Sequence, residues 1–294
     1  MNTINIENMP LTNIVLGTDG YGERIDVKTA NKIMDLYISF GGNVIDTARM
    51  YTDGKSEKIV GDFINKNNLR NKVYISTKCS HPPLQNMTQH RLTLKDIESD
   101  IDKSLMTLGV EYIDIIWLHR DDKSVCVQPI IDALNVMIEK GKVKYFGASN
   151  WSYKRIYEAN DYAKKSGLKG FCASQILYNM ATCNKMWDDT LVVCEGTEKQ
   201  QYDSSHFPVF AFCSQAKGFF EKYHSNSLST KAESRYLNDE TIKTYNKILE
   251  SSIQNGDTIS YTALKMLEKQ SDFPLLPIIG PSNIHQLKST LNIQ

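Results

Sequence analysis

The chain has 294 residues, of which 41% are hydrophobic, and its 34 basic and 34 acidic side chains give a formal net charge of zero. This length suits one α/β barrel, and the balanced charge gives no electrostatic reason to expect nucleic acid or an anionic membrane surface as a partner. No run approaches the roughly 18 apolar residues of a membrane span, and the first ten residues lack the basic and apolar regions of a secretory signal.

The cysteines are scattered along the chain. There are six of them, and no two form a C-x-x-C pair. We therefore predict no metal site and expect free thiols in a reducing cytoplasm.

Short apolar runs alternate with segments of helical periodicity from residue 14 onward. The eight runs that we predict to be strands are 14–17, 43–46, 73–78, 112–119, 143–149, 171–176, 208–214 and 275–280. The clearest predicted helices are 27–40, 56–67, 93–108, 128–140, 152–166 and 258–270. Near-continuous apolar runs are typical of buried parallel strands. The pattern predicts an α/β fold, a (β/α)8 TIM barrel in a single domain spanning residues 1–294, with a doubly wound open sheet as the alternative.

Two long stretches, 178–207 and 215–238, show no clear periodicity and are predicted to be functional or mobile loops. The segment "GTDGYG" (17–22) follows the first predicted strand. Its glycines do not have the G-x-G-x-x-G spacing of a dinucleotide-binding turn, so a Rossmann fold is disfavoured.

Polar residues stand where the predicted strands end. Asp46, Lys78 and His119 end the second, third and fourth strands, and Ser149-Asn150 ends the fifth. In a barrel these ends converge on the face that carries active sites. Each residue also has a structural interpretation: Asp46 as a helix cap, Lys78 as a solvated charge, and His119 as a hydrogen-bonded core residue.

Together with Tyr51, these residues are what hydride transfer to a carbonyl requires. The carbonyl oxygen gains negative charge and needs a proton donor, and tyrosine, with a pKa near 10, keeps its proton at neutral pH. A nearby Lys78 is expected to lower that pKa, and Asp46 to hold the lysine. A neutral His119 could donate a second hydrogen bond to the carbonyl oxygen.

Several segments together resemble the aldo-keto reductase superfamily. They are "NVIDTARMYTDGKSEKIVGDFI", "VYISTK", "DIIWLH", "GKVKYFGASNW" and "PIIGPSNIHQL", and they span about residues 11 to 292. The segments "LHRDD" and "AFCSQAKGFF" resemble a bacterial subgroup whose substrate we do not assign.

The resemblance implies an NAD(P)H-dependent reductase of an aldehyde, ketone or sugar carbonyl, with NADP(H) favoured over NAD(H). It implies Tyr51 as general acid, Lys78 and Asp46 as the pair that tunes it, and His119 as the group that orients the carbonyl. The residues matched to cofactor-binding positions are Ser149, Asn150, Gln175, Phe212, Ser214, Ala216, Gly218, Arg235, Gly280, Ser282 and Gln286.

Candidates for the substrate pocket are Tyr21, Arg120, Trp151 and Trp187. Arg120 could instead pair with Asp121 or Asp122, and the aromatic residues could pack at the barrel mouth. In "GKSE", Lys55 and Glu57 are expected to be solvated.

Two other functions remain open. One is a cofactor-binding regulatory or partner-docking subunit with little turnover, as some members of the superfamily are channel-associated subunits. The other is a cofactor-free lyase or isomerase that uses Lys78 as a Schiff-base amine. The sequence does not set the oligomeric state.

Overall fold

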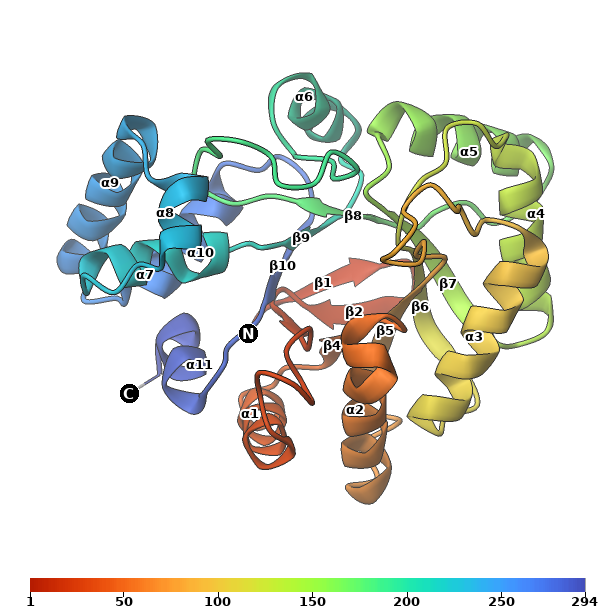
Figure 1. The fold of residues 1–294 in the computed structure, drawn as a ribbon, viewed down its shortest axis with the longest axis horizontal. Coiled ribbons are helices and arrows are strands. Elements are labelled where there is room, and N and C mark those ends of the chain that lie inside the picture. Colours follow the sequence, from red (N-terminus) through yellow and green to blue (C-terminus); the bar gives the residue numbers. More distant parts are fainter. Residues whose placement is uncertain (294) are drawn as a thin grey trace.

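The strands of the protein close on themselves. The computed structural model describes residues 1–293, and within them eight parallel strands form a barrel with helices around it (Figure 1). Each strand pairs with its neighbours in sequence, and β10 closes the barrel against β3. The barrel strands are β3 (Val15–Gly17), β4 (Val44–Asp46), β5 (Tyr74–Cys79), β6 (Ile113–Leu118), β7 (Val143–Ser149), β8 (Ser174–Leu177), β9 (Val209–Phe212) and β10 (Leu275–Ile279). The predicted TIM barrel is confirmed, and the open-sheet alternative is wrong.

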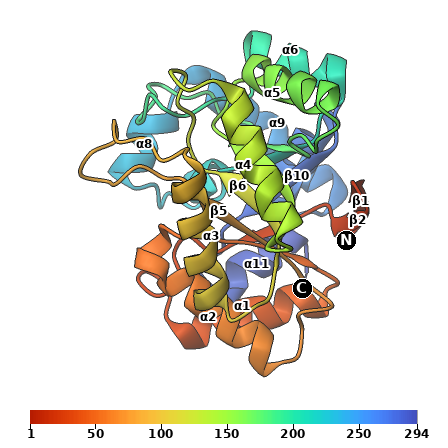
Figure 2. The same cartoon turned by 90° about the vertical axis from the view of Figure 1, so that its right-hand side faces the viewer.

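Helices cover the outside of the barrel, and Figure 2 shows α3 and α4 side by side, where they also contact each other. The longer helices are α1 (Val27–Ser39), α2 (Lys55–Lys66), α3 (Leu94–Leu108), α4 (Val127–Glu139), α5 (Tyr153–Lys165), α6 (Gly196–Ser205), α9 (Asp239–Asn255), α10 (Ile259–Lys269) and α11 (Ile284–Leu291). Side chains of Asp26, Thr93 and Thr258 cap α1, α3 and α10, as expected of such residues. None of the helices in residues 1–293 is long and apolar enough to cross a bilayer.

The two stretches predicted to be loops contain short helices, so that prediction was partly wrong. The first holds α6, and the second holds a 3₁₀ turn, η2 (Ala216–Gly218), with α7 (Phe219–His224) and α8 (Thr230–Tyr236). Within α6 only Tyr202 is buried, so the helix lacks the apolar stripe that a periodic pattern needs. The helices α7 and α8 have six and seven residues, too few to show a period.

An N-terminal hairpin escaped prediction. Its strands, β1 (Thr3–Ile6) and β2 (Met9–Thr12), pair antiparallel and have only four residues each. Leu11 lies in one buried cluster with Val15 and Val44, the first residues of β3 and β4. The hairpin therefore packs against the N-terminal end of the barrel, away from the strand ends that carry the candidate site.

Candidate active site

Asp46 and Lys78 form a buried ion pair at the carboxyl end of the barrel. Each is 2% exposed, and Nζ of Lys78 lies 2.5 Å from Oδ2 of Asp46. The same ammonium donates to the carbonyl oxygen of Thr47 at 2.7 Å. The other carboxylate oxygen, Oδ1, accepts from Ser76 Oγ at 2.6 Å and from Gln175 Nε2 at 3.1 Å. Both charges are therefore held in place by several hydrogen bonds, as buried ions require.

Tyr51 begins the 3₁₀ turn η1 (Tyr51–Gly54), and Lys78 Nζ lies over its ring, 4.7 Å from the ring centroid. Burial raises the pKa of the Tyr51 phenol and outweighs Lys78, which acts to lower it. The net shift is therefore opposite to the lowering that we expected from Lys78, and the phenol keeps its proton at neutral pH. Burial lowers the pKa of Lys78, but Asp46 and Tyr51 raise it above its usual range, so the ammonium stays charged.

His119 directly follows β6 and is 6% exposed. Its ring centroid lies 6.1 Å from that of Tyr51 and 4.7 Å from that of His81. Burial, with the positive charges of Arg120 and Lys78, holds the pKa of His119 well below its usual range. The imidazole is therefore neutral at neutral pH and can donate one hydrogen bond to a carbonyl oxygen.

A second ion pair, between the half-buried Arg49 and the buried Glu57, supports the turn that carries Tyr51. Residues 52–54 all have positive φ, of 47°, 53° and 80°, and a Cβ on Gly54 would overlap the guanidinium of Arg49. Glu57 is fully buried in α2 and accepts a hydrogen bond from Arg49 Nη1 at 2.7 Å. The expectation that Glu57 is solvated was wrong, because this pair needs it in the interior, whereas Lys55 is exposed as expected.

Three of the cofactor candidates lie beside this group. Ser149 and Gln175 are paired across β7 and β8, and Asn150 Nδ2 donates to Ser149 Oγ at 3.1 Å and to the His119 carbonyl at 3.3 Å. All three side chains are buried. The amides therefore lie at the same barrel mouth as the catalytic candidates.

Seven further cofactor candidates lie at the end of β9 or after β9 and β10, which are neighbours in the barrel. Ser214 Oγ donates to the Ile278 carbonyl at 2.8 Å, and the backbone nitrogen of Ser282 donates to Gln286 Oε1 at 2.7 Å. Phe212 ends β9, Ala216 and Gly218 bound η2, and Gly280 follows β10.

Arg235 reaches this region from α8. Its guanidinium lies 4.1 Å from the ring centroid of Trp187. Its Nη1 atom is buried and has no hydrogen-bond partner within residues 1–293. An anionic group, such as a cofactor phosphate, would satisfy this donor, so the residues present fit a phosphate-bearing cofactor.

The chain matches the model of the Aldo/keto reductase family over residues 13–294. It belongs to the aldo/keto reductase family. Its relatives include an aryl-alcohol dehydrogenase of Pestalotiopsis microspora, 33% identical over 155 residues, which cover 51% of this chain and 40% of that protein. A probable voltage-gated potassium channel subunit beta of Arabidopsis thaliana is 33% identical over 168 residues, which cover 56% of this chain and 51% of that protein. An aryl-alcohol dehydrogenase [NADP(+)] of Phanerodontia chrysosporium is 24% identical over 279 residues, which cover 91% of this chain and 72% of that protein. The chain thus spans about half, or less, of the first two relatives.

The pocket candidates of this aldo/keto reductase occupy different environments. Tyr21 and Trp151 are both fully buried, and Trp151 packs 5.2 Å from Phe171, so neither side chain has a face open to solvent here. Trp187 is half-buried beside Arg235. Arg120 pairs with Asp188, and Asp121 with Arg155, so the alternative that Arg120 pairs with Asp121 or Asp122 was wrong.

Sequence reasoning missed four groups at this mouth. Ser76 and Lys78 are two residues apart on β5, so strand periodicity alone places them on one face and could have identified Ser76. Thr47 contributes only its carbonyl oxygen, which no residue type reveals. His81 and Asp188 lie in loops, and no local pattern indicates that they meet His119 and Arg120.

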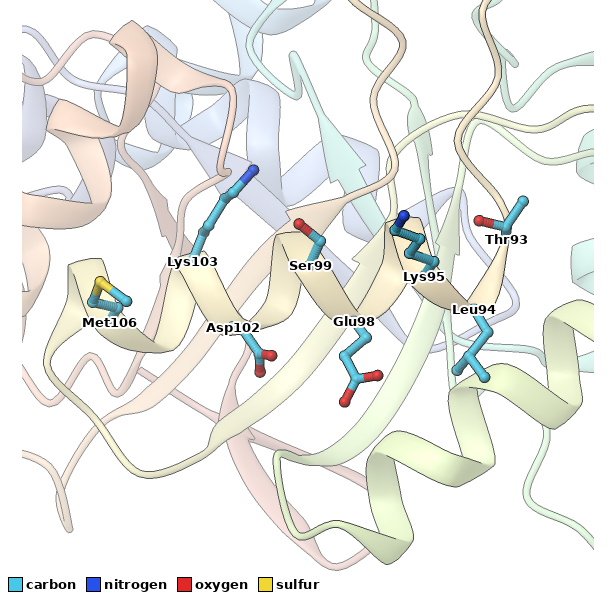
Figure 3. A pocket seen from close by; sticks show the side chains of 8 residues that line it. All are labelled: Thr93, Leu94, Lys95, Glu98, Ser99, Asp102, Lys103 and Met106. Carbon is cyan, nitrogen blue, oxygen red and sulfur yellow. The ribbon is translucent and has the colours of Figure 1, made fainter.

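A hollow along α3 lies apart from these groups. Figure 3 shows its lining residues, all of which come from α3 or its N-cap: Thr93, Leu94, Lys95, Glu98, Ser99, Asp102, Lys103 and Met106. Met106 is 82% exposed. This hollow is the surface of one helix, and it holds none of the catalytic candidates.

Proposed function

We propose that this protein is an NAD(P)H-dependent oxidoreductase that reduces an aldehyde, ketone or sugar carbonyl to an alcohol. The observation that carries the proposal is that the proton-holding Tyr51, the Lys78–Asp46 pair and the neutral His119 gather at one barrel mouth. Family membership supports carbonyl reduction as the class of reaction. We further propose that residues 1–294 act as one domain in the cytoplasm, where the six free cysteines would stay reduced.

When bound, a nicotinamide cofactor held by the residues named below would be the source of the hydride for the carbonyl carbon. Tyr51 gives its phenolic proton to the carbonyl oxygen, which completes the alcohol. The Lys78 ammonium, held by Asp46, stabilises the phenolate that remains on Tyr51. His119 donates a hydrogen bond to the carbonyl oxygen as its negative charge grows.

For the cofactor, we propose that Ser149, Asn150 and Gln175 hold the nicotinamide carboxamide. The remaining residues proposed to bind it are Phe212, Ser214, Ala216, Gly218, Arg235, Gly280, Ser282 and Gln286. NADP(H) is proposed over NAD(H), because Nη1 of Arg235, which has no hydrogen-bond partner in the described part of the chain, suits an additional phosphate. One relative is also named for NADP(+).

Replacing Tyr51 with Phe tests the proposal. The variant keeps the ring but loses the proton, so turnover should fall by about 100-fold or more, while NADPH binding stays. The measurements are absorbance at the nicotinamide band with a broad carbonyl panel, and tryptophan-quenching titrations with NADPH and NADH. If Tyr51→Phe reduces a good substrate as fast as the unchanged protein, the role given to Tyr51 is wrong.

A second candidate is a cofactor-binding regulatory or partner-docking subunit, because relatives in three organisms carry the name probable or putative voltage-gated potassium channel subunit beta. The same panel separates the two functions. Tight NADPH binding with no oxidation across the panel favours the subunit, whereas turnover that depends on Tyr51 favours the reductase.

A further inference from the structure

Arg120 lies directly after His119, its side chain is 12% exposed, and its charge acts on both His119 and Tyr51. Its guanidinium makes three contacts, each to a different group. Nη1 donates to the His119 carbonyl at 2.9 Å, and Nε donates to Thr190 Oγ1 at 2.9 Å. Nη2 donates to Asp188 Oδ2 at 3.2 Å. A cation is thus fixed next to the residue proposed to orient the carbonyl.

The group that Arg120 binds in this structure is a carboxylate, that of Asp188. Its Oδ1 atom is held by the backbone nitrogen and the hydroxyl of Thr190, at 2.9 and 2.6 Å. Only Oδ2 reaches Arg120, through a single contact, whereas arginine and carboxylate often make two parallel hydrogen bonds. Asp188 and Arg120 therefore share one hydrogen bond, where a carboxylate and a guanidinium can form two in parallel.

A neighbouring ion pair provides a comparison. Arg155 pairs with Asp121 at 2.9 Å and also donates to the Asp122 and Val125 carbonyls, and the Asp121 side chain is 6% exposed. The two arginine side chains are equally exposed, at 12%, so the pairs differ in their carboxylates. The Asp188 side chain is 27% exposed, so the carboxylate side of the Arg120–Asp188 pair is partly open to solvent.

We propose that Arg120 is a binding subsite for a carboxylate on the substrate, and that Asp188 fills this subsite when no substrate is bound. The inference rests on the proposed reductase function and specifies its substrate class: carbonyl compounds that also carry a carboxylate. The substrate carboxylate replaces Asp188 on Arg120, while the carbonyl oxygen lies between Tyr51 and His119.

Matched acids and esters test the subsite. The full chain with NADPH is given a series of aldehydes bearing a terminal carboxylate, of increasing chain length, and the methyl ester of each. The readout is the ratio of kcat/KM for acid over ester. Arg120→Gln should lower the best ratio by about 10- to 100-fold, the range expected for a charged hydrogen bond. Asp188→Asn removes the competing carboxylate and should raise the ratio.

The control is Lys58→Gln, which breaks an exposed pair on α2 far from His119 in the chain and should leave the ratio unchanged. If Arg120→Gln lowers acid and ester turnover by the same factor, Arg120 only fastens the loop and the inference is wrong. Should Arg120→Gln fold poorly, an unchanged ratio in Asp188→Asn overturns it equally. If esters are reduced but neither Arg120→Gln nor Asp188→Asn changes the acid-to-ester ratio, the carboxylate subsite is wrong and the reductase function stands. If neither acids nor esters are reduced, the proposed function fails with it.

Discussion

The protonation state of His119 decides whether it can help a carbonyl react. A charged imidazolium next to Lys78 and Arg120 would add a third positive charge in a buried space, which is costly. The environment therefore lowers the pKa of His119 well below its usual range. In the unfolded chain the same residue titrates near pH 6.5.

This difference predicts a pH dependence of stability. Below about pH 6.5 the unfolded chain binds a proton at His119 that the folded protein does not, so stability falls as pH falls through that window. The fall in Tm between about pH 7.5 and pH 5.5 should therefore be smaller in His119→Gln than in the unchanged protein. Thermal melts across that range check this, with the exposed His285→Gln as control. Equal falls in His119→Gln and the unchanged protein would show that His119 is not held neutral.

At the scale of elements, the first turn of α2, which contains Glu57, supports the 3₁₀ turn that begins at Tyr51. Glu57 in α2 holds Arg49, and Arg49 packs against Gly54, the last residue of the turn that Tyr51 begins. Glu57 Oε1 also accepts from Thr77 Oγ1 at 2.7 Å, which ties the helix to β5. The ion pair thus connects the turn, the helix and the strand that carries Lys78.

Breaking this pair should cost stability and activity together. Glu57→Ala leaves Arg49 without its carboxylate, and because Arg49 is 23% exposed, water relieves part of the penalty, leaving about 2–4 kcal/mol. Since the turn loses its support, kcat should also fall. Asp62→Ala, which breaks an exposed pair on the same helix, should cost less than about 1 kcal/mol and leave kcat unchanged. Urea unfolding and steady-state kinetics measure both; equal costs for the two variants would contradict this role.

The elements differ in how far the sequence reveals them. Barrel strands are continuous apolar runs, so their ends, and with them Asp46, Lys78 and His119, could be located by local pattern alone. Glu57 and Asp188 could not, because each is defined by an ion pair across sequence separations of 8 and 68 residues. The hairpin strands and α7 are too short for any periodicity, and α6 buries only one side chain.

At the scale of the whole molecule, the two ends of the barrel have different tasks. The carboxyl end gathers polar side chains that are buried and paired, such as Asp46, Lys78 and Gln175. The N-terminal end is filled by apolar side chains, in which the hairpin residues Ile6, Met9 and Leu11 meet the barrel interior. In barrels of this kind, residues at the N-terminal end contribute to stability and those at the carboxyl end to catalysis.

Leu11→Ala tests this division. Leu11 is fully buried, so truncation leaves a cavity and should cost about 2–5 kcal/mol of unfolding free energy. Because the hairpin is remote from the strand ends, kcat/KM of the folded variant should stay within about twofold of the unchanged protein. Tyr51→Phe should show the reverse pattern, with activity lost and stability kept. Urea unfolding, with kinetics well below the melting temperature, measures both quantities. A tenfold loss of kcat/KM in fully folded Leu11→Ala would mean that packing at the N-terminal end of the barrel sets the geometry of the site at its carboxyl end.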